Sequence, residues 1–215
     1  MLPLGDALSS QLNSMSVAES QLRSTAPARS REATRQRLAE AGTELFASDG
    51  LHGVTSSRIA AAAGVATGTF YLHFKDKEAL FREIVFKALR DLRERGRVAT
   101  VEAGPDPRAQ VRARTTELVA FAEENRSLIL VLFGRGHEAA GVADEVLDSL
   151  TPGIEEALRT RAAAGQLAPE LHAGVAAQAI AAMSARVIAW WVEDPSRATR
   201  EELIETLCRL HPTHR

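Results

Sequence analysis

The sequence predicts an all-α protein of about nine helices, and three observations support this. Ala, Leu, Arg and Glu are abundant, and these residues lose little rotamer freedom in a helix, whereas only 5% of the residues are aromatic. Apolar residues recur at helical spacing along most of the chain, and no run of strand length alternates apolar and polar residues. The 215 residues are enough for one domain or two small ones.

The chain divides into three regions by composition and charge. Residues 1–28 are rich in Ser, Gln and Ala, and we expect either a disordered arm or an over-extended start with Met15 as the alternative beginning. Residues 29–100 carry 13 Lys and Arg against 9 Asp and Glu, whereas residues 101–215 carry 12 against 17. A basic front and an acidic rear are typical of two regions with different tasks, although chance asymmetry of solvated helix faces gives the same pattern.

A first helix is predicted over residues 30–48, where Leu38, Ala41, Leu45 and Phe46 form one apolar stripe. Gly50 ends this helix, and the stretch DGLHG forms a turn.

Two short helices and a longer one follow this turn. Thr55 suits the N-cap of the first short helix, and Gly64 supplies the left-handed conformation of a tight corner. The second short helix covers about residues 67–73. Asp76 suits the start of the longer helix because a carboxylate is favourable there. Its inward stripe is Leu80, Phe81, Ile84, Val85, Ala88, Leu89 and Leu92.

The second half is predicted to contain longer helices. One spans residues 107–124, and LILVLF at residues 128–133 is apolar on all sides, which indicates a buried helix. The next helix, around residues 146–158, contains Pro152 and Gly153, which should kink or split it. An Ala-rich helix over residues 169–191 and a last helix over residues 199–210 complete the chain.

The corner at Gly64 leaves polar tips outside the core. Phe70 and Phe74 lie at positions i and i+4 and face inward, while Thr67, Thr69, Tyr71 and His73 are left over. Such a ridge could enter a major groove, where hydroxyls and an imidazole meet phosphates or base edges. A helix-turn-helix can equally be a plain packing corner, so the corner alone does not decide between the two.

The longer stretch TSSRIAAAAGVATGTFYLHFKDKEAL closely resembles the DNA-binding signature of tetracycline-repressor-type (TetR family) regulators. The resemblance implies a three-helix DNA-binding domain at residues 29–76 and a larger helical effector-binding and dimerisation domain at residues 77–215. Its implied DNA contacts are Thr55, Ser56, Thr67, Gly68, Thr69, Tyr71, His73 and Lys77. Ala66 departs from the usual Ser or Thr cap of the recognition helix, and Thr67 is expected to share that task. Arginines 29, 31, 35 and 37 could follow the DNA backbone.

The resemblance further implies a homodimer that binds a palindromic double-stranded DNA operator and releases it when a small effector binds. The helix ending at Trp191, with Leu203, Ile204, Leu207 and Leu210, could build the dimer contact, and the alternative is a helix buried in the core of its own chain. Mostly aliphatic walls favour an apolar or amphipathic effector. The candidate ligand residues are Leu118, Phe121, Phe133, His137, Met183 and Arg186. A filled core is the alternative for the apolar ones, and a surface group or one satisfied by a neighbour is the alternative for His137 and Arg186.

Other classes of function lack support in the sequence. No Gly-rich phosphate loop, HExxH or GxSxG occurs, so no catalytic residues, metal site or cofactor are predicted. Cys208 is the only cysteine, which favours a reducing compartment, and we expect a cytoplasmic protein without a membrane span or secretory signal. The alternative to a ligand-responsive regulator is a ligand-independent architectural or regulatory DNA-binding protein, which would not need the long apolar second half. A helical interaction module is a further alternative.

Overall fold

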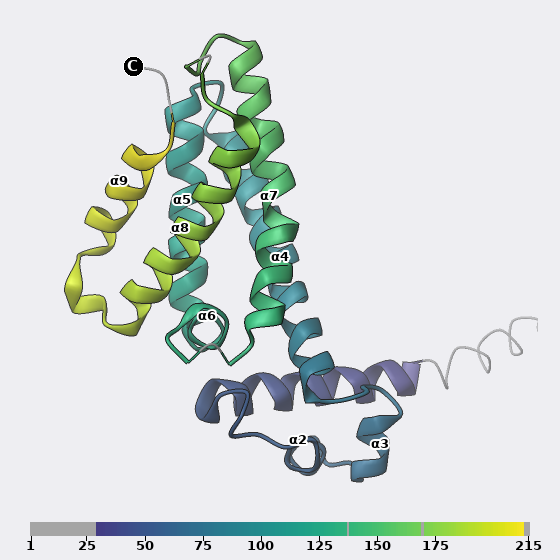
Figure 1. Cartoon of the computed structure of the whole chain (residues 1–215). Coiled ribbons are helices and arrows are strands. Elements are labelled where there is room, and N and C mark those ends of the chain that lie inside the picture. The colour runs from purple at the N-terminus through teal and green to yellow at the C-terminus, as the bar shows by residue number, and fades with distance from the viewer. Residues whose placement is uncertain (1–28, 137, 169, 213–215) are drawn as a thin grey trace, which may run out of the picture.

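The computed structural model describes residues 29–136, 138–168 and 170–212, as Figure 1 shows. Within these ranges it contains nine α-helices, one short 3-10 helix and no strand, which confirms the all-α prediction. The arm predicted for residues 1–28 lies outside the described residues.

The N-terminal helices form one end of the molecule, at the bottom of Figure 1. The first helix covers residues 29–49, and α2 (Ser56–Ala62) and α3 (Thr67–Tyr71) follow it. Their apolar stripes meet in a core where Leu38, Ile59 and Phe70 are completely buried. Deep burial of one large side chain from each helix explains how such short helices are stable in this position.

Helix α4 (Lys77–Glu102) connects this end to the rest of the molecule. The side chain of its N-cap, Asp76, accepts the backbone N–H of Ala79 at 2.7 Å, as predicted for a carboxylate at a helix start. The first helix approaches α4 closely, because a Cβ at Gly42 would lie only 2.7 Å from Leu80 Cδ2. The absence of a side chain at residue 42 therefore sets how tightly the two helices pack.

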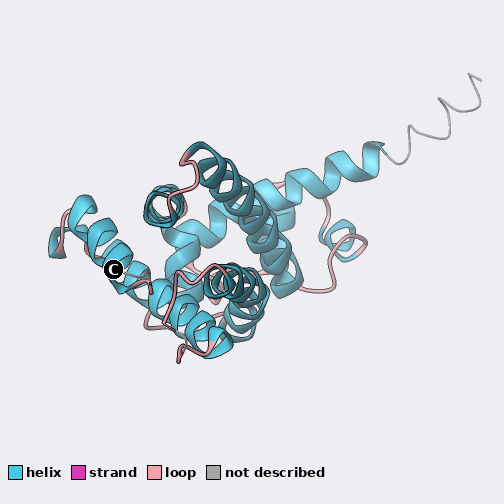
Figure 2. Cartoon of the chain, turned by 90° about the horizontal axis from the view of Figure 1, so that it is seen from above, coloured by secondary structure: helices cyan, strands magenta, loops and turns pink. Residues whose placement is uncertain are grey.

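The remaining helices pack into a bundle above the N-terminal end. They are α5 (Pro107–Glu124), α6 (Arg126–Phe133), α7 (Ala140–Ala163), α8 (Ala173–Glu193) and α9 (Arg200–Leu210). Figure 2 looks down on this bundle and shows the first helix extending beyond it. Val119, Ile129, Ile188 and Ile204 share a core that joins α5, α6, α8 and α9.

The two ends of the molecule share hydrophobic packing. Val131 and Leu132 of α6 and Val142 and Val146 of α7 belong to the same buried cluster as the N-terminal helices. The domain boundary predicted between residues 76 and 77 coincides with the start of α4, but apolar contacts continue across it. A change in the position of α6 or α7 would therefore change the packing of the N-terminal helices.

The sequence predicts a kink or a split at Pro152 and Gly153, and helix α7 is continuous through both residues, so the helix is not split. Two hydroxyl groups just before the proline donate hydrogen bonds to backbone carbonyls. Ser149 Oγ donates to Val146 O and Thr151 Oγ1 donates to Leu147 O, both at 2.8 Å. A guanidinium nitrogen of Arg93 also donates to Ser149 O at 2.5 Å. These side chains add hydrogen bonds to carbonyls near the proline, which itself has no N–H to donate, and α7 packs against α6 and α8.

Helix α8 is the one helix in the described ranges that is long and apolar enough to cross a membrane by length and composition alone. The sequence analysis did not single it out for this property. In the structure α8 packs within the bundle, and Ala177, Ile180, Ile188 and Val192 are buried there. A core helix explains the same composition.

Candidate DNA-binding surface and effector cavity

The corner between α2 and α3 has the geometry that the sequence predicts. Gly64 has a φ of 67°, in the left-handed region that favours glycine. Its N–H donates to Ala61 O at 3.1 Å, and the next N–H, of Val65, donates to Ala60 O at 3.0 Å. These two bonds close the end of α2 and fix the angle at which α3 leaves the corner.

The start of α2 uses Thr55 as its N-cap. The Thr55 hydroxyl oxygen accepts the backbone N–H of Arg58 at 3.3 Å and lies 3.1 Å from Ser57 Oγ. Thr55 is exposed and Ser56 is half-buried at the first helical position. The helix end therefore presents a hydroxyl and free backbone amides to the outside, an arrangement that favours a phosphate.

Helix α3 exposes its N-terminal turn. Thr67 and Gly68 are exposed and Thr69 is half-buried, and a Cβ added at Gly68 would meet no atom within 4 Å. Ala66 is the N-cap, and no side chain caps the helix, so the predicted capping by Thr67 is not observed. The Thr67 hydroxyl makes no hydrogen bond to the described residues and remains available to a partner.

Tyr71 and His73 differ in how freely they project. Tyr71 is 58% exposed and packs the edge of its ring against Phe70, with ring centroids 5.4 Å apart. His73 is half-buried, and its pKa is lowered by burial and by the nearby Arg31 and Arg35. The imidazole is therefore neutral at pH 7 and can donate or accept a hydrogen bond, while Tyr71 offers a hydroxyl at the end of a rigid ring.

Lys77 occupies a different environment from the one its predicted role assumed. Its ammonium group donates to Leu51 O at 2.8 Å and to Val54 O at 2.9 Å, and the side chain is half-buried. Two of its three donors are therefore used by the turn before α2. Lys77 therefore does not project freely from the surface, because the carbonyls of this turn lie within its reach.

Arg35 is likewise committed to the fold. Its guanidinium pairs with Glu83, donates to His73 O at 2.9 Å and lies over the Phe74 ring, 4.4 Å from the centroid. It therefore joins the first helix to the end of α3 and to α4. By contrast, the side chains at residues 29, 31 and 37 are exposed on the first helix.

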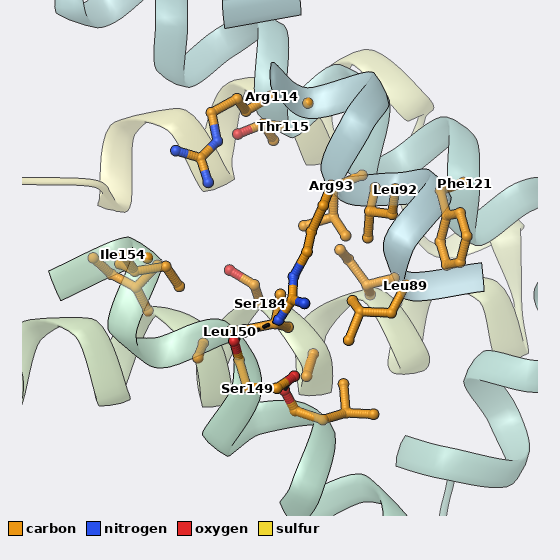
Figure 3. Close-up of a pocket in the computed structure, with 18 of the residues that line it drawn as sticks. Leu89, Leu92, Arg93, Arg114, Thr115, Phe121, Ser149, Leu150, Ile154 and Ser184 are labelled. Carbon is orange, nitrogen blue, oxygen red and sulfur yellow. Dashed lines mark hydrogen bonds between the residues drawn. The ribbon is translucent and has the colours of Figure 1, made fainter. Parts of the chain in front are cut away.

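A cavity of about 750 Å³ lies among α4, α5, α6, α7 and α8 (Figure 3). Most of its wall is apolar, and of the predicted ligand residues Leu118, Phe121 and Phe133 line it. A volume of this size is typical of small-molecule sites. The prediction of an aliphatic and aromatic wall between the middle helices thus agrees with the cavity.

Two other predicted ligand residues, Met183 and Arg186, do not line the cavity. Met183 packs against the core of α5, α6, α8 and α9, and Arg186 is exposed and donates to Phe133 O at 3.0 Å. Helix α8 instead turns Ala181, Ser184 and Ile188 toward the cavity, which places residues 183 and 186 on other faces. His137 lies outside the described residues.

Basic side chains also line the cavity, and the sequence analysis did not single them out. Figure 3 shows Arg114 of α5 and Arg93 of α4 reaching inward, and Arg161 of α7 and His211, which follows α9, are further lining residues. No local pattern marks these residues, since each stands among other arginines or near the chain end. Only the packing of three separate helices brings them to one cavity.

Glu138, in the segment between α6 and α7, links the cavity walls to the N-terminal end. Its Oε2 accepts the backbone N–H of Leu51 at 2.7 Å and that of His52 at 3.3 Å. Both amides belong to the turn that Lys77 braces from the other side. The turn before α2 is therefore held by a carboxylate from the bundle and an ammonium from α4.

The described residues contain no group of three or more His, Cys, Asp or Glu side chains that could hold a metal ion.

Comparison with known sequences places residues 38–84 in a described family, "Bacterial regulatory proteins, tetR family". The chain is 45% identical to the HTH-type transcriptional regulator AcrR of Shigella flexneri over 51 residues, 24% of each chain. It is 34% identical to the repressor KstR2 of Rhodococcus jostii over 97 residues, 45% of this chain and 47% of KstR2. These two matches thus span less than half of each relative.

A longer match, at 27% identity over 168 residues, is to the repressor BepR of Brucella suis and covers 74% of this chain and 80% of BepR. Among solved structures, the fatty acid degradation regulator FadR of Bacillus halodurans superposes with a TM-score of 0.71 at 24% identity, covering 83% of this chain and 94% of FadR. FadR of Bacillus subtilis in complex with stearoyl-CoA gives 0.69 at 22% identity, covering 82% and 97%. At these identities the structural matches establish the fold.

Proposed function

Because the chain belongs to the TetR family of bacterial regulatory proteins, we propose that it is a DNA-binding transcriptional regulator whose operator affinity responds to a small molecule. The single observation that carries the proposal is the exposed N-terminal turn of α3, held by the left-handed Gly64 corner within the matched segment. Such a regulator acts in the cytoplasm, where operator DNA is found. Its relatives are regulators, and we propose no catalytic activity.

Helix α3 enters the major groove in this proposal. Thr67 and Thr69 offer hydroxyls to base edges, and the bare Gly68 lets the backbone approach the DNA closely. Ser56, Tyr71 and His73 contact phosphates on either side. Thr55 and Lys77 act mainly through the fold: Thr55 caps α2, and Lys77 positions the turn that precedes it.

A homodimer is the second part of the proposal. Leu203, Ile204 and Leu207, which the sequence analysis assigned to the dimer contact, are buried in the core of their own chain and cannot form it. The exposed face of α8 supports the contact instead, since its outward residues follow one helical stripe. These are Val175, Ala179, Ala182, Arg186 and Trp190, with the exposed Leu210 of α9.

The cavity is the proposed effector site. Its walls include Leu89 of α4 and Leu132 of α6, and both residues also belong to the core shared with the N-terminal helices. A ligand that fits better when α4 and α6 have shifted would change the spacing of the two α3 helices in a dimer. Operator affinity would then fall by the coupling free energy, typically about 1–3 kcal/mol.

Selection of bound sequences from random duplex DNA, followed by gel-shift titration at several salt concentrations, tests the proposal. We expect a near-palindromic site and a slope of log K against log[salt] that steepens by about 0.9 for each phosphate contacted. Failure to bind any duplex at low salt would overturn the DNA-binding assignment. A selected site whose affinity no small molecule alters would favour the ligand-independent alternative.

A further inference from the structure

Five basic groups line the cavity, and two of them have partners: Arg97 pairs with Glu94, and Arg93 donates to Ser149 O. The side chains of the other three have no partner among the described residues. Arg114, Arg161 and His211 come from α5, α7 and the segment after α9. Among the described residues, neither arginine forms an ion pair or a side-chain hydrogen bond. Arg112, on the same helix as Arg114, pairs with both Glu201 and Glu205, as surface arginines of this chain usually do. Arg114 and Arg161 therefore differ from Arg97 and Arg112 in having no anion beside them.

Burial and the proximity of the three groups to one another disfavour their charged forms. Burial lowers the pKa of Arg114, and burial together with Arg114 lowers the pKa of Arg161. Burial, Arg161 and Arg114 lower the pKa of His211 to about 4, and its Nδ1 is buried without a hydrogen-bond partner among the described residues. Arg114 keeps an accessible surface because its guanidinium points into the open cavity (Figure 3).

Holding two guanidiniums and an imidazole together in this way is unfavourable unless an anion joins them. An arginine away from bulk water is normally paired, since desolvation weakens the charged form. Arginine presents a planar set of donors that matches the two oxygens of a carboxylate or the oxygens of a phosphate. The three groups thus form a preformed site for an oxyanion.

Most of the remaining cavity wall is apolar, although Arg93, Ser149 and Ser184 also line it. Leu89, Leu92, Phe121, Leu150 and Ile154 line it, and Figure 3 shows Arg114 and these apolar side chains around one open volume. Apolar walls favour a ligand body that leaves water, at roughly 25 cal/mol per Å² buried. One end of the ligand is therefore charged and the remainder is hydrocarbon-like.

We propose that the cavity binds an amphipathic anion, whose oxyanion head is held by Arg114 and Arg161 beside His211 and whose apolar body lies along Leu89, Phe121 and Ile154. The inference rests on the proposed effector site and specifies its ligand class. The head is a carboxylate or a phosphate, since either supplies the required oxygens.

The first test compares four probes that share one twelve-carbon chain: dodecanoate, dodecyl phosphate, dodecanol and dodecylammonium. Isothermal titration calorimetry below their critical micelle concentrations gives the dissociation constants. We expect at least one anion to bind roughly 10- to 100-fold more tightly than dodecanol, as charge-assisted hydrogen bonds to a desolvated arginine would give. The tighter anion identifies the head group. Equal binding of dodecanol, preferential binding of dodecylammonium, or no binding of either anion would overturn the proposal.

The second test uses charge-removing variants. Arg114→Gln and Arg161→Gln should each weaken binding of the preferred anion roughly 10- to 100-fold and leave dodecanol binding unchanged. Arg90→Gln is the matched control, because Arg90 is an exposed arginine of α4 outside the cavity wall. The ligand-free melting temperature of Arg114→Gln should stay the same or rise, since a repulsion is removed. Unchanged anion affinity in both cavity variants would contradict the proposal.

The third test measures a pKa in the wild-type chain, so it does not require that any variant folds. The anion should raise the pKa of His211 in the wild-type chain, because a negative charge favours the imidazolium form. NMR titration of the His211 ring with and without the anion measures this, and an unchanged pKa would count against the proposed position of the head. Gel shifts without ligand test the proposed function separately. If the chain bound the anion but bound no DNA, the proposed DNA-binding function would be wrong and the proposed anion site would stand.

Discussion

Glu138 Oε2 accepts the backbone N–H of Leu51 at 2.7 Å and so ties the segment between α6 and α7 to the turn before α2. The carboxylate also accepts the N–H of His52, and it lies within 3.0 Å of where a Cβ at Gly50 would stand. Gly50 has a φ of 70°, so a larger residue there would be strained as well as crowded. The contact is thus a specific one between the bundle and the DNA-binding end.

Glu138→Ala should weaken this link. Two backbone amides lose a charged acceptor, so the free energy of unfolding should fall by roughly 1–3 kcal/mol, as measured in urea. The ratio of operator affinities without and with effector should also shrink, because the turn no longer follows α6 and α7. Glu156→Ala, on the exposed side of α7, is the control and should change neither quantity. If the ratio of operator affinities in Glu138→Ala equalled that of the wild-type chain, α4 alone would link effector binding to DNA binding.

Lys77→Met should lower the stability of the fold and, as a consequence, the affinity for the operator. The substitution leaves Leu51 O and Val54 O without their ammonium donor and should cost roughly 1–3 kcal/mol in urea unfolding. Operator affinity should fall because the turn that positions α2 loosens. Lys75→Met removes a neighbouring charge from an exposed side chain and should leave stability unchanged. If Lys77→Met lost DNA binding with no loss of stability, a direct phosphate contact would be the better explanation.

Thr67→Ala and Tyr71→Phe should act on DNA binding alone. Each removes a hydroxyl that makes no hydrogen bond to the described residues, so the melting temperature should not move. Gel-shift affinity for the selected operator should fall by several-fold for each hydroxyl lost, corresponding to roughly 1 kcal/mol. An unchanged affinity in both variants would mean that α3 does not lie against the DNA as proposed.

Phe70→Ala is the contrasting change on the same helix. Phe70 is completely buried between Tyr71, Phe74 and the core, so its removal should destabilise the fold by roughly 3–5 kcal/mol. Thermal or urea unfolding measures the effect directly. A wild-type unfolding curve would show that the inward face of α3 is misassigned.

His211 predicts a specific pH dependence. Its pKa in the folded chain is about 4, below the ordinary value of 6.5, so between these values the unfolded chain binds more protons. Its contribution to stability is therefore present above about pH 6.5 and is lost as the pH falls toward 4, by at most roughly 3 kcal/mol. The groups that oppose its protonation are Arg114 and Arg161. His211→Gln should lose less stability than wild type over this range in urea titrations, and parallel curves would contradict the assignment.

Local patterns in the sequence predicted most of the helices. The limits of α5 agree with the prediction, and Thr55, Asp76 and Gly64 take their expected roles as two N-caps and a left-handed corner. Capping and left-handed conformations depend on residues close in the chain, which explains the agreement. Helix α7 is not split, because packing on neighbouring helices outweighs the local preference of Pro152.

Side-chain partners from distant segments could not be predicted in the same way. Lys77 meets carbonyls 23 and 26 residues away, and Arg35 meets Glu83, 48 residues away. The buried leucines of α9 look like an interface stripe in sequence, and only the fold shows that α5 and α8 cover them. The arginines of the cavity are distinguished only by their neighbours in the folded structure, and composition and residue spacing do not predict those neighbours.

Helix α4 has a geometric consequence for signalling. At 1.5 Å per residue its 26 residues form a rod of about 39 Å, braced at its middle by residues that belong to both cores. A tilt of about 5° around that middle would displace either tip by roughly 1.7 Å, and two such rods related by a two-fold axis would separate their recognition helices by about twice that amount. A displacement of this size exceeds the range of donor–acceptor distances in a direct hydrogen bond. A ligand that tilts α4 by only a few degrees would therefore break contacts between the recognition helices and the duplex.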